Sequence, residues 1–175
     1  PFAVAIPPDA KNSAALFRAA HRGEREVVLH VPLEPVNYPQ VDPGAGTLLV
    51  TMSRTRIAGE LRRQIEQARP VVAVANLMGS LATQDMTAMT AIYGELKRER
   101  LPFIHLMAAP GAVCRPLASQ LGVAYDEPDE VFDAEARART PAALDRRWKS
   151  FLKSIPPGGQ RQVWVRATPT SRAWI

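Results

Sequence analysis

Short apolar runs alternate along this chain with longer segments whose apolar residues recur every three or four positions. The runs predict strands at 2–6, 26–30, 71–75, 102–106, 123–125 and 162–167. The longer segments predict helices at 9–20, 53–68, 114–121 and 140–153, and one more that starts at Thr83 or Asp85. Strands that alternate with helices favour an α/β fold with a parallel sheet or barrel.

Local signals fix several of these boundaries. Ser53 is a typical N-cap, and the apolar residues after it are spaced by 4, 4 and 3 positions: Ile57, Leu61, Ile65 and Ala68. Thr140 followed by Pro141 marks another helix start. In the helix after Asp85, the side chains expected to face the core are Met86, Met89, Ile92, Tyr93 and Leu96. The segment 36–46 is rich in Pro and Gly, so we expect a loop that could wall a substrate groove.

The stretch Val27–Pro35 (VVLHVPLEP) carries the first candidate chemistry. His30 ends a buried apolar run, Pro32 is expected to stop ladder pairing, and Glu34 follows in an irregular segment. A histidine and a carboxylate just beyond a buried strand occupy the usual position of an active site in α/β folds. Asn76, Gly79 and Ser80 form a second polar turn, after the 71–75 run.

Length and composition describe an ordinary globular chain. With 175 residues, 46% hydrophobic and 22% charged, we expect a single domain over 1–175. No apolar run approaches the ~20 residues that span a bilayer. The chain starts at Pro1, so we expect a mature form, a trimmed form or a fragment. The single Cys114 is interpreted as helix packing.

Charge is unevenly distributed. Residues 137–175 hold nine Lys or Arg and one acid, Asp145, whereas 126–135 holds six acids in ten residues. A basic end can meet an acidic partner or an anionic envelope surface, or can be the solvated face of one helix that pairs with the acidic loop. Nucleic acid is disfavoured because stacking platforms and nucleic-acid motifs are absent. The acids lack the spacing of a calcium loop.

Several segments together resemble the divergent polysaccharide deacetylase family, relatives of the NodB-type carbohydrate esterases. The opening AVAIPPDAKNSAALFRAAHRGEREVVLHVPLEP resembles its second strand, helix and H-x-P-x-E-P turn. The segment NLMGS resembles the family's N-H-M-G-S turn. The next helix and strand of the family are matched by TQDMTAMTAIYGELKRERLPFI, and a later helix with its acidic segment is matched by LASQLGVAYDEPDEVF. The resemblance implies a NodB-like incomplete or distorted (β/α) barrel of mostly parallel strands.

Active members of that family bind zinc or another divalent metal through an aspartate and two histidines, and deacetylate amino sugars. The metal polarises the amide carbonyl and activates water, while a carboxylate takes the proton. By position, the resemblance implies that His30 is a metal ligand or general base; its alternative is a relic of the site that hydrogen-bonds across the barrel mouth. Asn76, Gly79 and Ser80 are expected to bind sugar hydroxyls or, alternatively, to form a purely structural tight turn. Glu34 is the catalytic carboxylate, a substrate contact or an orienter of His30; its alternative is a turn residue that caps a helix. His105 could replace a lost metal ligand, or be an ordinary histidine at a strand end.

The departures from the family pattern are specific. Its first strand, with paired aspartates, would precede Pro1, and Leu77 stands where the second histidine is expected. The aspartate after the next strand is replaced near His105, and the late Gly-His-Pro turn reads Ala-Thr-Pro at 167–169. A zinc site needs three protein ligands, so we expect a degenerate site that holds no metal tightly.

The leading hypothesis is a catalytically weak or inactive domain that binds, or helps to process, an envelope polysaccharide. One alternative is an active metal-dependent N-deacetylase completed by residues outside this chain. Another is a non-enzymatic module that uses the basic C-terminal face. The resemblance also implies a periplasmic or otherwise extracytoplasmic location.

Overall fold

A computed structural model describes residues 2–132 and 140–174, which divide into two compact units, 1–126 and 127–175. The single domain over 1–175 stays a prediction. Within the described residues, no helix has both the length and the hydropathy to cross a bilayer.

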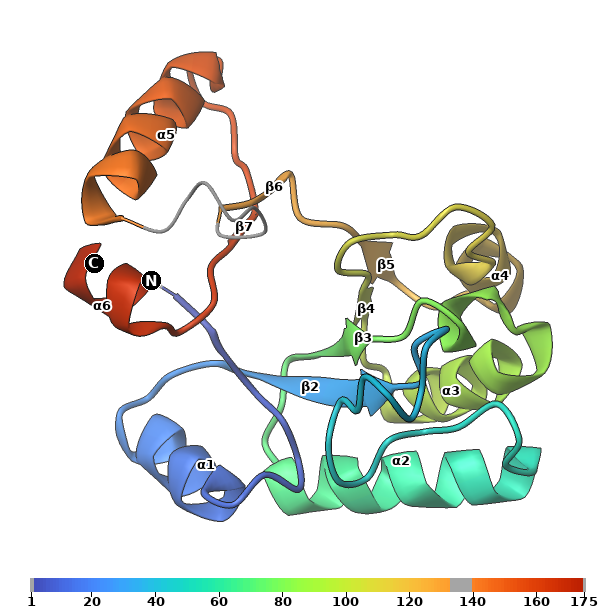
Figure 1. The fold of residues 1–175 in the computed structure, drawn as a ribbon. Helices are drawn as coiled ribbons and strands as arrows, with labels where there is room; N and C mark the ends of the chain where they lie inside the picture. Colours follow the sequence, from blue (N-terminus) through green and yellow to red (C-terminus); the bar gives the residue numbers. More distant parts are fainter. Residues whose placement is uncertain (1, 133–139, 175) are drawn as a thin grey trace. The chain divides into compact units, whose positions relative to one another are not determined.

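The first unit is built on a parallel sheet (Figure 1). Its strands pair in chain order and are β1 (Val4–Ile6), β2 (Val27–Leu33), β3 (Ala73–Met78), β4 (Phe103–Ile104) and β5 (Tyr125–Asp126). The helices are α1 (Ser13–Arg22), α2 (Arg54–Ala68), α3 (Met86–Glu99) and α4 (Cys114–Leu121), with a short 3-10 helix η1 (Ala82–Gln84) before α3. The predicted α/β fold is confirmed. The described strands form an open sheet, which is consistent with an incomplete barrel.

One apolar cluster joins the four helices to one face of this sheet. Leu29 and Val31 of β2, Val74 of β3 and Phe103 of β4 belong to it, and alternate strand residues such as Ala75 do not. Because successive strand residues point to opposite faces, the helices cover one face only. The helical members include the four residues predicted for α2, all buried: Ile57, Leu61, Ile65 and Ala68.

The cap signals place two helix starts correctly. The hydroxyl of Ser53 accepts from Arg56 N at 3.2 Å, and the carboxylate of Asp85 accepts from Ala88 N at 2.7 Å. The predicted start of the first helix at residue 9 is wrong, because α1 begins at Ser13. Met86 is also misplaced by the prediction, since its side chain is 53% exposed in the first turn of α3.

β2 continues through Pro32, which corrects the prediction that this proline ends ladder pairing. Pro32 lies in register with Leu77 of β3, and Leu33 with Met78. The Pro32 carbonyl accepts from Leu48 N at 2.9 Å, on the side away from β3. A residue in a parallel strand turns its N–H and C=O toward the same neighbour. The missing N–H of Pro32 therefore faces the loop, and the β2–β3 ladder loses nothing.

Other strands differ from prediction in length. β3 starts two residues late, at Ala73, and continues through Asn76 to Met78, so the polar turn begins only at Gly79. β4 is only two residues long, although the 102–106 run predicts five. After β4 the backbone continues alongside β5, because His105 N donates to Asp126 O at 2.8 Å.

The second unit holds a two-stranded parallel sheet, β6 (Glu130–Val131) and β7 (Val163–Trp164), with α5 (Pro141–Ser154) and α6 (Pro169–Trp174). Thr140 caps α5 as predicted, whereas α6 was not predicted. Phe132 is buried against rings of both helices: Trp148, Phe151 and Trp174. The acidic segment pairs with the basic helix as predicted, through Glu130 and Arg147. Asp133 and Glu135 lie outside the described residues.

Candidate functional site

The polar residues predicted at two strand ends come together at one edge of the sheet. β2 and β3 pair along six residues, so the segments that follow Leu33 and Met78 leave the sheet side by side. The Glu34 carbonyl accepts from Leu81 N at 3.1 Å and from Ala82 N at 3.0 Å, which joins the two segments directly. His30, Glu34, Asn76, Gly79 and Ser80 therefore belong to one strand-end region.

His30 lies in β2 on the face opposite the helix-covered core. Its neighbours Leu29 and Val31 belong to the core cluster, while His30 is in register with Ala75, which does not. Its Nε2 donates to Asn76 O at 3.2 Å, because a carbonyl can only accept. Burial lowers the pKa of His30 from 6.5 to about 4, against a smaller opposing effect of this hydrogen bond. The imidazole is neutral at pH 7, the form required of a general base or ligand.

A neutral, half-buried His30 makes the stability of the fold depend on pH. The unfolded chain binds a proton here below pH 6.5, whereas the folded chain does so only near pH 4. Stability is therefore lost as the pH falls through this window, by roughly 2–3 kcal/mol at about pH 4.5. His30→Gln retains a donor for Asn76 O but cannot titrate. Between about pH 7.5 and 4.5, we expect the free energy of unfolding of His30→Gln, measured with urea, to fall by roughly 2–3 kcal/mol less than that of the unmodified protein. Equal pH dependence in both proteins would contradict this.

His105 lies on the other face of the sheet. It is buried, its Nδ1 is 2.9 Å from the Tyr125 hydroxyl, and its ring packs beside Phe103 and Tyr125. His105 follows Phe103 by two residues and so shares its face of the sheet, the one that the helices cover. His30 lies on the opposite face, so the two predicted metal ligands are not brought together. Across residues 2–132 and 140–174, no three His, Cys, Asp or Glu side chains are grouped as metal ligands would be. The described donor set does not fit a three-ligand zinc centre.

Glu34 holds the long loop between β2 and α2 in place. Its Oε2 accepts from Val50 N at 2.6 Å, and its own N–H donates to Leu48 O at 3.1 Å. The side chain is half-buried. These contacts match its alternative interpretation, a residue that stabilises a turn, although the segment it holds precedes α2 and is not a helix end. A catalytic role for Glu34 stays a prediction.

Asn76 is a buried clamp between β3 and the segment after β4. Its Oδ1 accepts from Leu106 N at 2.7 Å, while its Nδ2 donates to Met78 O at 2.7 Å and to Leu106 O at 3.1 Å. Both amide protons and one oxygen lone pair are thus used inside the protein. Substrate binding by Asn76 stays a prediction, but both of its amide protons are already bonded inside the protein.

Gly79 and Ser80 form the tight turn after β3. Gly79 has φ +95°, and a Cβ there would lie 2.7 Å from the Leu33 Cβ. The Ser80 hydroxyl accepts from Val36 N at 3.1 Å, which fixes the loop just beyond Glu34. This turn therefore needs glycine for both backbone conformation and space. Substrate binding by Gly79 and Ser80 stays a prediction.

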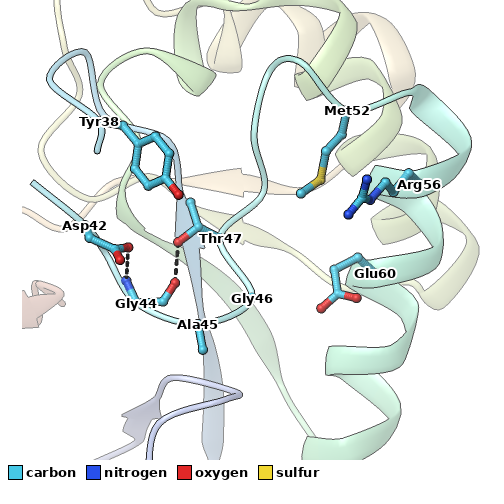
Figure 2. Close-up of a pocket in the computed structure, with 9 residues that line it drawn as sticks. All are labelled: Tyr38, Asp42, Gly44, Ala45, Gly46, Thr47, Met52, Arg56 and Glu60. Carbon is cyan, nitrogen blue, oxygen red and sulfur yellow. Dashed lines mark hydrogen bonds between the residues drawn. The ribbon is translucent and has the colours of Figure 1, made fainter. Parts of the chain in front are cut away.

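The loop between β2 and α2 walls a pocket that the sequence did not locate. The pocket has a volume of about 530 Å³, and its lining includes Tyr38 of the loop and Met52, Arg56 and Glu60 at or in α2 (Figure 2). The loop walls this cavity beside α2, and its predicted role in a substrate groove next to Glu34 stays a prediction. Two features of the sequence could have indicated this pocket: a tyrosine within a long loop rich in Pro and Gly, and the helix that follows that loop.

Comparison with known proteins identifies the family. The profile of the family "Divergent polysaccharide deacetylase" matches residues 1–154. The chain belongs to the divergent polysaccharide deacetylase family. The resemblance predicted from the H-x-P-x-E-P and M-G-S segments is therefore confirmed. The matched region includes the strand-end region that holds His30 and Glu34.

Two curated proteins and one solved structure are similar to this family member. An uncharacterized protein of Haemophilus influenzae is 28% identical over 120 residues, which cover 69% of this chain and 42% of the relative. The uncharacterized protein YibQ of Escherichia coli is 28% identical over 101 residues, covering 58% and 31%. The chain thus spans less than half the length of these relatives. The crystal structure of uncharacterized protein ATU2773 from Agrobacterium tumefaciens shares the fold, with a TM-score of 0.83 and 22% identity over 98% of this chain and 68% of that one.

Proposed function

We propose that this divergent polysaccharide deacetylase domain binds an extracytoplasmic envelope polysaccharide, or helps to process it, with weak or no metal-dependent deacetylation. The carbohydrate partner rests on family membership. The weak catalysis rests on one observation: polar side chains at the ends of β2 and β3 are bonded to the protein's own backbone. Glu34 holds Val50, Asn76 holds Leu106, and Ser80 holds Val36.

The positions of the two histidines support the same proposal. His30 and His105 lie on opposite faces of the sheet, and Leu77, where the family motif has a histidine, cannot bind a metal. A deacetylase of this class needs a metal to polarise the amide and activate water. The strand-end region instead provides a polar edge of the sheet, in which the neutral imidazole of His30 lies near the tight turn at Gly79 and Ser80.

Metal content tests this proposal. We expect purified protein to carry well under one zinc, or other divalent metal, per chain by elemental analysis, and to release no acetate from N-acetylglucosamine oligosaccharides. His30→Ala serves as the comparison, and it should change neither result. One tightly bound metal per chain that is lost in His30→Ala would overturn the proposal.

A second candidate is an active N-deacetylase completed by residues outside this chain. It is favoured by the lengths of the curated relatives, more than half of which lies beyond the matched region. The full-length relative from Escherichia coli provides the test. Metal-dependent acetate release by that protein, lost when its metal is removed by a chelator and restored by zinc, would favour this candidate. Inactivity with added zinc would favour the first.

A further inference from the structure

The pocket beside α2 is separate from the strand-end region, and we name it the Tyr38–Arg56 pocket. Its walls are the loop from Tyr38 to Thr47 and the side of α2 that carries Arg56 and Glu60, with Met52 between them (Figure 2). A volume of about 530 Å³ falls within the roughly 300–1,000 Å³ of small-molecule sites. Nothing in the proposed function assigns a role to it.

The loop wall of this pocket is pre-formed. The Asp42 carboxylate accepts from Gly44 N at 2.8 Å, and the Thr47 hydroxyl donates to Gly44 O at 2.6 Å. Gln64, a fully buried residue of α2, donates to Gly46 O at 2.8 Å and so ties the loop to the helix. A ligand can then bind without first ordering the loop, which removes a large cost of association.

The helix wall presents the Arg56 guanidinium, which lies close enough to Glu60 to lower the pKa of that carboxyl slightly but forms no ion pair with it in the described residues. Arg56 and Glu60 are one turn apart on α2, a spacing that allows opposite charges to pair. The Glu60 carboxylate is instead held by Arg63 and by Gln64, and the Arg63 guanidinium keeps the pKa of Glu60 below its ordinary value. Within residues 2–132 and 140–174, the Arg56 guanidinium has no hydrogen bond or ion pair.

The opposite wall presents an aromatic ring. Tyr38 is half-buried, and its hydroxyl has no hydrogen-bond partner in the described part of the chain. Figure 2 shows the Tyr38 ring and the Arg56 side chain extending from the loop and from α2 toward the same space. The pocket therefore combines a flat apolar face, unused donors on both walls and the carboxylates of Asp42 and Glu60.

We propose that the Tyr38–Arg56 pocket binds one neutral sugar ring of the polysaccharide, an inference that rests on the carbohydrate partner of the proposed function. The C–H face of the ring packs on Tyr38, whose π-system offers a large apolar surface. The planar fork of Arg56 donates to two adjacent hydroxyls, and Asp42 and Glu60 accept from others. A neutral ring rich in hydroxyls suits a lining that offers both acceptors, Asp42 and Glu60, and a donor, Arg56. Arg63 pairs with both Glu60 and Asp9.

Titration with the tetrasaccharide of N-acetylglucosamine, followed by amide chemical shifts, tests this site. We expect shifts concentrated in residues 38–60. Tyr38→Ala and Arg56→Ala should each raise the Kd at least about tenfold, because each removes the main contact of one wall. Tyr38→Phe keeps the ring and should change the Kd by less than about threefold. Arg18→Ala, which removes an exposed arginine of α1, is the matched control and should change nothing.

The outcomes separate this site from the proposed function. Shifts confined to the ends of β2 and β3, with Arg56→Ala binding as the unmodified protein does, would overturn the sugar site and leave the carbohydrate function standing. The absence of any shift would contradict both. Arg56 is exposed, and its guanidinium makes no hydrogen bond or ion pair in the described residues beyond a weak attraction to Glu60. Its alanine variant should therefore change the Tm by no more than a few degrees and report mainly on binding.

Discussion

Asn76→Ala is expected to lower the free energy of unfolding by about 2–4 kcal/mol. The substitution removes three hydrogen bonds of 2.7–3.1 Å and leaves the N–H and C=O of Leu106 and the C=O of Met78 without this partner. A buried backbone group that loses its partner costs about 1–3 kcal/mol. Because the three bonds share one side chain, the losses overlap and do not simply add. Urea unfolding measured by circular dichroism gives the value.

Two further variants show whether the effect comes from the clamp. Asn37→Ala changes an exposed asparagine in the loop and should shift stability by less than about 0.5 kcal/mol. Asn76→Asp keeps the acceptor for Leu106 N but loses both donors, so we expect it to destabilise and to recover partly when acid protonates the carboxyl. Unchanged stability in Asn76→Ala, combined with lost oligosaccharide binding, would instead assign Asn76 to the substrate.

Elements fixed by neighbouring residues could be predicted from the sequence. The N-cap Ser53 predicted where α2 starts, and the spacing of its apolar residues predicted which of its side chains are buried. The predicted range of α4, Cys114–Leu121, matches the structure. β2 was predicted too short, because the direction in which Pro32 faces depends on Leu48, a residue of the returning loop. The omission of α6 is different. Thr168 and Pro169 repeat the Thr–Pro signal that predicts α5, so the information was present in the chain.

The sequence could predict where the candidate site lies in the fold, but not which contacts its side chains make. The order of strands and turns correctly placed His30 and Glu34 beside the turn at Gly79. The sequence could not indicate that Asn76 is bonded by Leu106, thirty residues away, or that His105 lies on the opposite face from His30. Such partners depend on which strands pair and on which face each residue takes. For the same reason, the Tyr38–Arg56 pocket is visible only in three dimensions.

Gly79→Ala is expected to destabilise the fold by about 3 kcal/mol. At φ +95° a residue with a Cβ is strained, and this alone costs roughly 1–2 kcal/mol. The added Cβ would also lie 2.7 Å from the Leu33 Cβ. That atom is attached directly to the β2 backbone and cannot rotate away, so strand and turn must separate, at about 1–3 kcal/mol for overpacking.

Two helical glycines provide matched controls for this substitution. A Cβ added at Gly59 in α2 or at Gly94 in α3 would have nothing within 4 Å of it. Alanine at either position should stabilise by about 0.5–1 kcal/mol, because it favours the helix and restricts the unfolded chain. If alanine lowers the free energy of unfolding at Gly79 but raises it at Gly59 and Gly94, the strain lies in the turn. A Gly79→Ala variant as stable as the parent would mean that the turn can move away from Leu33. The polar edge beside His30 would then be adjustable, and a sugar could reshape it on binding.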